Sequence, residues 1–245
     1  RVLFRSAQEG PIYAPTLALR ELHPEYADRI PSVAEQFTPD NHHDMVRFEI
    51  MKQFGYFVTE SSEHSSEYYP WFIKKDHPEL IDRFHIPLDE YPRRCRDQIA
   101  RWKQQAEHLV HNENLTHTRS SEYAAGIIEA LETGRTFGFA GNVLNTGLID
   151  NLPFDACVEV SCMVNEGHLS PCHMGPLPNQ LAALNRRQIE VHQLTVDAAL
   201  TRKKEYIYQA AMLDPHAGSE LTIDEIRSLV DDLIQAHGDW LPEYH

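Results

Sequence analysis

The sequence has little cysteine, few basic side chains and no long hydrophobic run. Its 245 residues include 22 Lys and Arg against 37 Asp and Glu, which gives a formal net charge of -15. This acidic excess leaves no basic face for a phosphate backbone, so we expect no nucleic-acid partner. No apolar stretch approaches the ~20 residues that span a bilayer, so we expect no membrane partner either.

Cysteine is scarce, and its placement argues against disulfides. The four cysteines are Cys95, Cys157, Cys162 and Cys172. Three of them share one apolar segment, which is typical of buried free thiols and of a reduced, cytoplasmic compartment. With His173 they could form a zinc site, but the C-x4-C-x9-C-H spacing lacks the usual close ligand pairs. His42 and His43 are interpreted as scattered surface histidines, so we expect no metal ligands in this span.

Several catalytic and cofactor signatures are absent. The sequence has neither G-x-G-x-x-G nor G-x-x-x-x-G-K-[ST], so nothing in it cradles a nucleotide phosphate by itself. It also lacks H-E-x-x-H and G-x-S-x-G. We therefore expect no cofactor-binding residues in this span. With 42% hydrophobic residues, the chain should nevertheless fold around a sizeable core.

Hydrophobic spacing predicts a helix-rich α+β domain around a small mixed or antiparallel sheet. Helical patterns follow Asp44 up to Gly55 and then cover residues 92–111, 122–131, 180–200, 201–212 and 222–237. Strand patterns dominate residues 137–164, and Tyr56–Val58 is predicted to be a brief strand. We expect one domain over residues 10–245. Residues 1–9 are irregular and can be foreign to it.

The densest group of chemically useful side chains lies between Glu60 and Glu67. Three carboxylates and His64 occur there within eight residues, and aromatic residues follow at once. Carboxylates and an imidazole supply general acid–base groups, and aromatic faces suit the apolar side of a sugar ring. The alternative is a solvated polar loop with an aromatic anchor. Both interpretations stay open on spacing alone.

Asparagines punctuate the strand region and offer neutral amides. Asn142, Asn145 and Asn151 are predicted to lie on turns between strands. Such amides can bind hydroxyl groups. Asparagine in turns more often serves the left-handed backbone conformation, so a structural role is the more common outcome.

A set of segments carries a resemblance to a known family. They include residues 55–64, 67–68, 70–72, 87–92, 141–143, 147–153, 157–160, 177–178, 181–184, 214–216, 230–234 and 237–242. Together they resemble the central and C-terminal parts of glycoside hydrolase family 4, and most closely its melibiase-type α-galactosidases. The resemblance covers about residues 10 to 245.

The resemblance implies a C-terminal domain of the lactate/malate dehydrogenase-like kind. Family members place an NAD-binding Rossmann domain, and a Cys and a His that hold manganese, before this region. Residues 11–17 resemble the stretch that follows the metal-binding His, and the chain opens with Arg1 rather than Met. We therefore expect the C-terminal portion of a cytoplasmic homodimer or homotetramer, with NAD and manganese bound mainly by the preceding part.

The resemblance also implies a reaction and its site. In this family NAD oxidises the sugar C3 hydroxyl, a base removes the C2 proton, and the glycosidic oxygen leaves by elimination. Glu60 is the expected C2 base, with Ser62 or Glu63 in its place if the alignment shifts. His64 and Asn151 are expected to contact sugar hydroxyls.

Two alternatives to an α-galactosidase remain at this point. One is the same chemistry on α-glucosides or α-galacturonides. The other is a non-catalytic fragment that serves as an oligomer interface.

Overall fold

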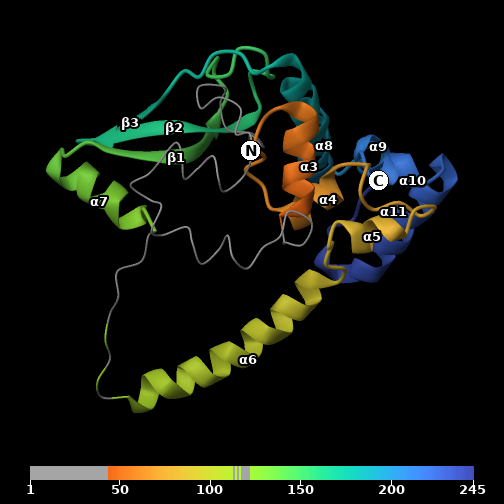
Figure 1. Ribbon diagram of the computed structural model, residues 1–245, viewed down its shortest axis with the longest axis horizontal. Coiled ribbons are helices and arrows are strands. Elements are labelled where there is room, and N and C mark those ends of the chain that lie inside the picture. Colours follow the sequence, from red (N-terminus) through yellow and green to blue (C-terminus); the bar gives the residue numbers. More distant parts are fainter. Residues whose placement is uncertain (1–43, 113, 115, 117–121) are drawn as a thin grey trace. The chain divides into compact units, whose positions relative to one another are not determined.

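The computed structural model describes residues 44–112, 114, 116 and 122–245 (Figure 1). The predicted loops of residues 1–43, with His42 and His43, lie outside this part. The described chain forms two compact units. One holds the residues up to Ile86 with Gly138–Met163 and Leu169–His245, and the other holds Pro87–Phe137 with Val164–His168. The predicted domain boundaries stay a prediction.

Three helices open the first unit: α3 (Met45–Phe54), α4 (Ser62–Tyr68) and α5 (Glu79–Arg83). The predicted helix after Asp44 is confirmed as α3, which buries Val46 and Ile50 and ends at Gly55 with a φ of 79°. Glycine adopts this left-handed conformation without strain. One hydrophobic core joins this region to α8: Val46, Ile50, Val58, Tyr69, Phe72, Phe84, Ile86 and Leu181.

The sheet is small, as the sequence predicts. Its three antiparallel strands are β1 (Phe137–Leu144), β2 (Cys157–Asn165) and β3 (His168–Pro171), in the order β1-β2-β3. Val158, Val160 and Cys162 alternate with more exposed residues along β2, so one face of the strand is buried. That face packs with Leu177 and Ile189. The prediction of a helix-rich α+β fold with a small sheet is confirmed.

The C-terminal part is helical: α8 (Asn179–Thr201), α9 (Lys204–Leu213), α10 (Ala217–Glu220), α11 (Ile223–His237) and the short 3₁₀ helix η3 (Gly238–Trp240). The predicted break between α8 and α9 falls at Arg202, which has a φ of 62°. The predicted capping box is also present. Thr222 Oγ1 accepts the Glu225 N–H, and the Glu225 carboxylate accepts the Thr222 N–H at 2.8 Å.

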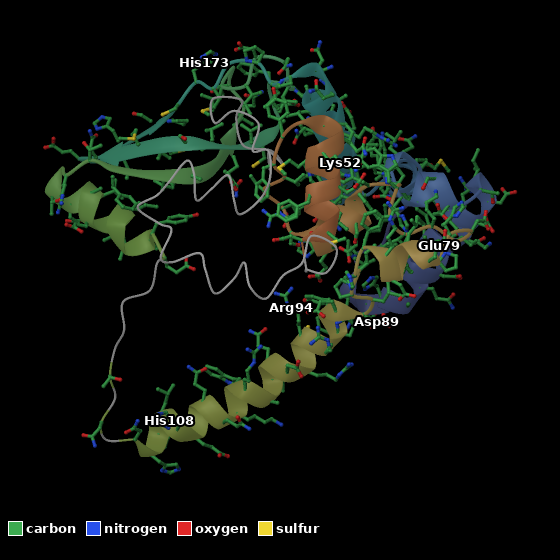
Figure 2. The ribbon with its side chains drawn as sticks, viewed as in Figure 1. Lys52, Glu79, Asp89, Arg94, His108 and His173 are labelled. Atoms are coloured by element: carbon green, nitrogen blue, oxygen red, sulfur yellow. The ribbon has the colours of Figure 1, made fainter. Side chains whose placement is uncertain are left out.

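The second unit contains α6 (Glu90–His111) and α7 (Ala124–Thr133). Helix α6 is predicted correctly, but it buries none of its residues. Ile99 and Trp102, on its apolar face, are 59% and 62% exposed. Figure 2 shows Arg94 and His108 near its two ends. Within the described residues, no helix is long and apolar enough to cross a membrane.

Three local predictions are wrong. Tyr56–Val58 forms only an isolated bridge at Val58 rather than a strand, and most of the expected polar loop is the helix α4. Serine capping explains the helix, because the Ser61 side chain accepts the His64 N–H and so satisfies a free helix donor. Asn142 lies inside β1 rather than on a turn.

Candidate active site

The segment that precedes α4 is anchored by Arg47 of α3. The Arg47 guanidinium donates to the Val58 carbonyl at 3.1 and 2.9 Å, and Val58 is fully buried. Ser61 then caps α4, with its Oγ 3.2 Å from the His64 nitrogen. The segment that carries Glu60 is therefore held at both of its ends.

Glu60 is a buried carboxylate, only 7% exposed. Its Oε1 accepts the Ser61 N–H at 3.1 Å and lies 3.1 Å from His64 Nδ1. Burial of a charge is costly unless hydrogen bonds compensate for the lost water, and both contacts do so. The structure thus pairs two of the side chains that the sequence singled out.

His64 is the exposed partner in this pair, and 40% of its side chain is open to solvent. On its other side, one helical turn later, the Tyr68 ring lies at 6.0 Å in a tilted arrangement. In the described part of the chain, no side chain hydrogen-bonds to Nε2. The geometry is that of a partly exposed imidazole with Nδ1 on a carboxylate.

The alternative base positions lie in different surroundings. Ser62 is 7% exposed, and its Oγ accepts the Arg47 N–H at 3.2 Å and lies 3.5 Å from Asp44 Oδ1. Its hydroxyl is therefore engaged with α3. Glu63 is half-buried in the first turn of α4, and its carbonyl accepts the Ser66 hydroxyl at 2.6 Å. Among the predicted base positions, Glu60 has a carboxylate oxygen in hydrogen-bond geometry with His64 Nδ1, at 3.1 Å.

Asn151 lies in a turn, as predicted, and its side chain joins two segments. Its Oδ1 accepts the Leu177 N–H at 2.9 Å and its Nδ2 donates to the Leu177 carbonyl at 2.8 Å. Its own carbonyl accepts the Arg186 Nε–H at 3.1 Å. This clamp is structural, and no hydrogen bond connects Asn151 to Glu60 or His64 among the described residues. The sugar contact at Asn151 stays a prediction.

Beside Asn151 lies an acid–imidazole pair that sequence reasoning missed. His173 Nε2 is 2.7 Å from Asp150 Oδ1, and both side chains are well exposed (His173 is labelled in Figure 2). The two residues are 23 positions apart in the chain. No local pattern connects positions so far apart, so only the folded structure shows this pair.

The aromatic residues after α4 pack mainly on one another. Trp71 stacks with Phe54 at 5.4 Å and with Tyr69 at 5.1 Å between ring centroids. Tyr69 is 2% exposed, and burial raises the pKa of its hydroxyl above the usual range. The Phe54 and Trp71 rings line a shallow hollow of about 540 Å³ that also includes Arg83. This packing fits the aromatic-anchor interpretation.

The metal-ligating side chains of the described residues do not form a metal site by themselves. Within this part of the chain, no three His, Cys, Asp or Glu side chains gather as a metal-binding group. All four cysteines are free. Cys162 is buried, Cys157 is exposed, and Cys95 and Cys172 are intermediate, so the expectation of buried thiols holds for one of them.

The fold is shared with solved proteins of the dehydrogenase-like glycosidase class. The structure of lplD from Bacillus subtilis matches with a TM-score of 0.71 and 21% identity, over 88% of this chain and 49% of that one. The 6-phospho-β-glucosidase of Thermotoga maritima matches with a TM-score of 0.62 and 19% identity, over 87% of this chain and 48% of that one. A form of that enzyme was solved with manganese, NAD⁺ and glucose-6-phosphate. It matches with a TM-score of 0.59 and 19% identity, over 80% of this chain and 45% of that one. At these identities the likeness defines the fold.

Sequence comparison then identifies the family. The Family 4 glycosyl hydrolase C-terminal domain matches residues 17–217, so the chain belongs to glycoside hydrolase family 4, as its motifs predict. An α-galactosidase of Bacillus subtilis (strain 168) is 57% identical over 224 residues, 91% of this chain and 51% of that protein. An α-galacturonidase of Lachnoclostridium phytofermentans is 26% identical over 200 residues, which are 81% of this chain and 43% of that protein. The chain spans about half the length of the curated relatives it matches.

Proposed function

We propose that this chain is the C-terminal part of an α-galactosidase that uses NAD and manganese. The 57% identity to an α-galactosidase over 91% of the chain carries the proposal. The match to an α-galacturonidase is 26%, which favours a neutral galactoside over a galacturonide. The α-glucoside alternative has less support, because the relative with 57% identity is named an α-galactosidase.

The cofactors belong to the complete protein in this proposal. The preceding part of the complete protein would hold NAD and a divalent ion, which would supply hydride transfer at the sugar C3 and polarisation of the C3 oxygen. The described residues do not fit either group, since they contain no metal-binding cluster and the sequence has no dinucleotide fingerprint. We propose proton transfer and substrate contact as the contribution of this chain.

Proton transfer at C2 is assigned to the region around α4. Glu60 is the proposed base, with Ser62 and Glu63 as alternatives, and His64 and Asn151 are proposed to contact sugar hydroxyls. The paired geometry of Glu60 and His64 supports this placement, since a carboxylate and an imidazole 3.1 Å apart can share and transfer a proton.

Assembly into a homodimer or homotetramer is part of the proposal. Its support is α6, a 22-residue helix that buries none of its side chains in this chain and exposes an apolar face. A face of this kind is typical of protein contacts. The cytoplasm is proposed as the compartment because all four cysteines are free.

One experiment tests the reaction. The complete protein is assayed with a chromogenic α-galactoside, with and without NAD, manganese and a reductant. We expect cleavage only when NAD and the metal are both supplied, because the C3 hydroxyl must be oxidised before the C2 proton becomes acidic. Cleavage that does not depend on NAD would contradict the mechanism, and α-galacturonide and α-glucoside substrates test the alternatives. The chain alone is expected to be inactive.

A further inference from the structure

The position of Glu60 fits a supporting role better than direct contact with a sugar. A general base must come within hydrogen-bond reach of the proton that it removes. Glu60 is 7% exposed, and its Oε1 already lies 3.1 Å from both the Ser61 nitrogen and His64 Nδ1. To reach a substrate carbon, this oxygen would have to leave both contacts. Its neighbour His64 has no such constraint.

The imidazole of His64 has the complementary geometry. Nδ1 lies on the Glu60 carboxylate, and an ionised carboxylate can only accept, so we assign the proton of the neutral ring to Nδ1 and the lone pair to Nε2. The side chain is 40% exposed, and in the described residues nothing hydrogen-bonds to Nε2. The basic nitrogen of a partly exposed ring oriented by Glu60 is therefore left without a hydrogen bond among the described residues.

We propose that His64 accepts the C2 proton of the sugar and that Glu60 is the positioning residue that fixes its tautomer. This inference rests on the proposed function, which supplies the C3 ketone. It exchanges the roles expected from the sequence, in which Glu60 was the base and His64 contacted a hydroxyl.

The proton transfer balances without any further reactant. The C2–H bond breaks, its electron pair becomes the C2–C3 double bond, and the carbonyl pair moves onto the C3 oxygen. The proton forms a bond to Nε2, and the resulting imidazolium is stabilised by the Glu60 carboxylate on Nδ1. The same nitrogen returns the proton to C2 in the later addition step.

The surroundings hold the ring in place. Ser61 fixes the His64 backbone through the 3.2 Å capping bond, and Tyr68 packs against the ring at 6.0 Å. The charged groups that face α4 from α3 are Asp44 and Arg47, which form an ion pair at 3.2 Å. The carboxylate in contact with the imidazole is that of Glu60, 3.1 Å from Nδ1.

The test uses the complete protein loaded with NAD and manganese. Exchange of the substrate C2 proton with solvent deuterium is followed by NMR, and hydride transfer by the absorbance of reduced nicotinamide. In His64→Gln we expect exchange to fall at least ~100-fold while hydride transfer continues. A matched control is His77→Gln, since His77 Nδ1 also lies 3.1 Å from a carboxylate, Glu79, but on the exposed surface. Its exchange rate should not change.

Glu60 is tested by a conservative and a disruptive change. Glu60→Gln keeps an oxygen that can accept from Nδ1, so it should retain exchange within about tenfold, whereas Glu60→Ala should lose ~100-fold. Histidine nitrogen NMR of the protein without cofactors should show the Nδ1–H tautomer at His64, and the Nε2–H tautomer in Glu60→Ala. If Glu60 were itself the base, Glu60→Gln would be as inactive as Glu60→Ala.

The outcomes separate the two proposals. NAD-dependent cleavage by the unchanged protein, together with undiminished exchange in His64→Gln, overturns the role of His64 and leaves the proposed function standing. Absence of NAD-dependent cleavage in the unchanged protein overturns both. If His64→Gln also loses hydride transfer, His64→Ala with added imidazole decides. Restored exchange supports the proposal, and unrestored exchange overturns it.

Discussion

At the scale of single residues, Asn145 shows how a turn residue can organise a whole segment. It is fully buried, and its Nδ2 lies 3.0, 3.1 and 2.9 Å from the carbonyls of Ile149, Leu152 and Pro153. Its Oδ1 accepts the Ile149 N–H at 2.8 Å. Asn145 therefore has a structural role, but through side-chain hydrogen bonds rather than through the left-handed backbone conformation expected from the sequence. Its hydrogen bonds shape the turn that carries Asn151.

We expect Asn145→Leu to lower the free energy of unfolding by about 3 kcal/mol or more. The change removes every side-chain hydrogen bond of Asn145 and leaves buried polar groups without this partner. Equilibrium unfolding in urea measures the loss. The matched control is Asn142→Leu, on the exposed side of β1, which should change stability by less than ~0.5 kcal/mol. Equal effects of the two substitutions would contradict this account.

Other features at the residue scale could not be predicted from the sequence. The cluster from Glu60 to His64 was visible as a run of acid–base groups, but not as a pair. Which oxygen lies against which nitrogen depends on the Ser61 cap and on the burial of Glu60, and both arise only in the folded chain. The contact between Asp150 and His173 had no sequence signal at all.

At the scale of elements, long periodic segments were predicted well and short ones poorly. Helices α3, α6, α8, α9 and α11 each carry several turns of apolar spacing or a recognisable end, and those signals are local. Helix α4 has only seven residues, SEHSSEY, with no apolar stripe. Its formation depends on the Ser61 cap and on burial of Ser65 and Ser66, which is a tertiary effect.

A contact between elements should make stability depend on pH. Glu220 of α10 pairs with Lys74 and accepts the Lys75 N–H at 2.9 Å. The Lys74 hydrogen bond, followed by that from Lys75, lowers the pKa of Glu220 from 4.5 to about 2. A carboxyl whose pKa is lowered in the folded state stabilises the fold at pH values above its pKa in the unfolded chain. This contribution disappears as pH falls from about 4.5 to about 2.

We therefore expect Glu220→Gln to lower the urea midpoint slightly at neutral pH and to have no effect near pH 2. The effect should be small, because both side chains keep contact with solvent. Glu190→Gln, an exposed change in the middle of α8, serves as the control and should be neutral at both pH values. A Glu220→Gln effect that persists below pH 2 would refute the assignment.

At the scale of the whole molecule, α6 makes an assembly testable. If its apolar face lies in a subunit contact, Trp102→Glu should weaken association by at least ~30-fold, since large aromatic residues dominate such interfaces. Sedimentation velocity of the complete protein measures the change. Gln104→Glu places the same charge on an exposed position of α6 outside the apolar set and should leave association intact. Unchanged association of the Trp102 variant would remove α6 from the contact.

The sequence by itself determined the family, the helix-rich α+β fold and the long helices. These properties depend on apolar spacing, helix caps and short motifs. Each of these signals lies within a few neighbouring residues and can be recognised without the tertiary structure. Only the tertiary structure decided that Glu60 is buried against His64, that Ser61 starts a helix there, and that Asn151 is held by Leu177. Burial and hydrogen-bond partners depend on which distant segments pack together, and that information exists only once the chain has folded.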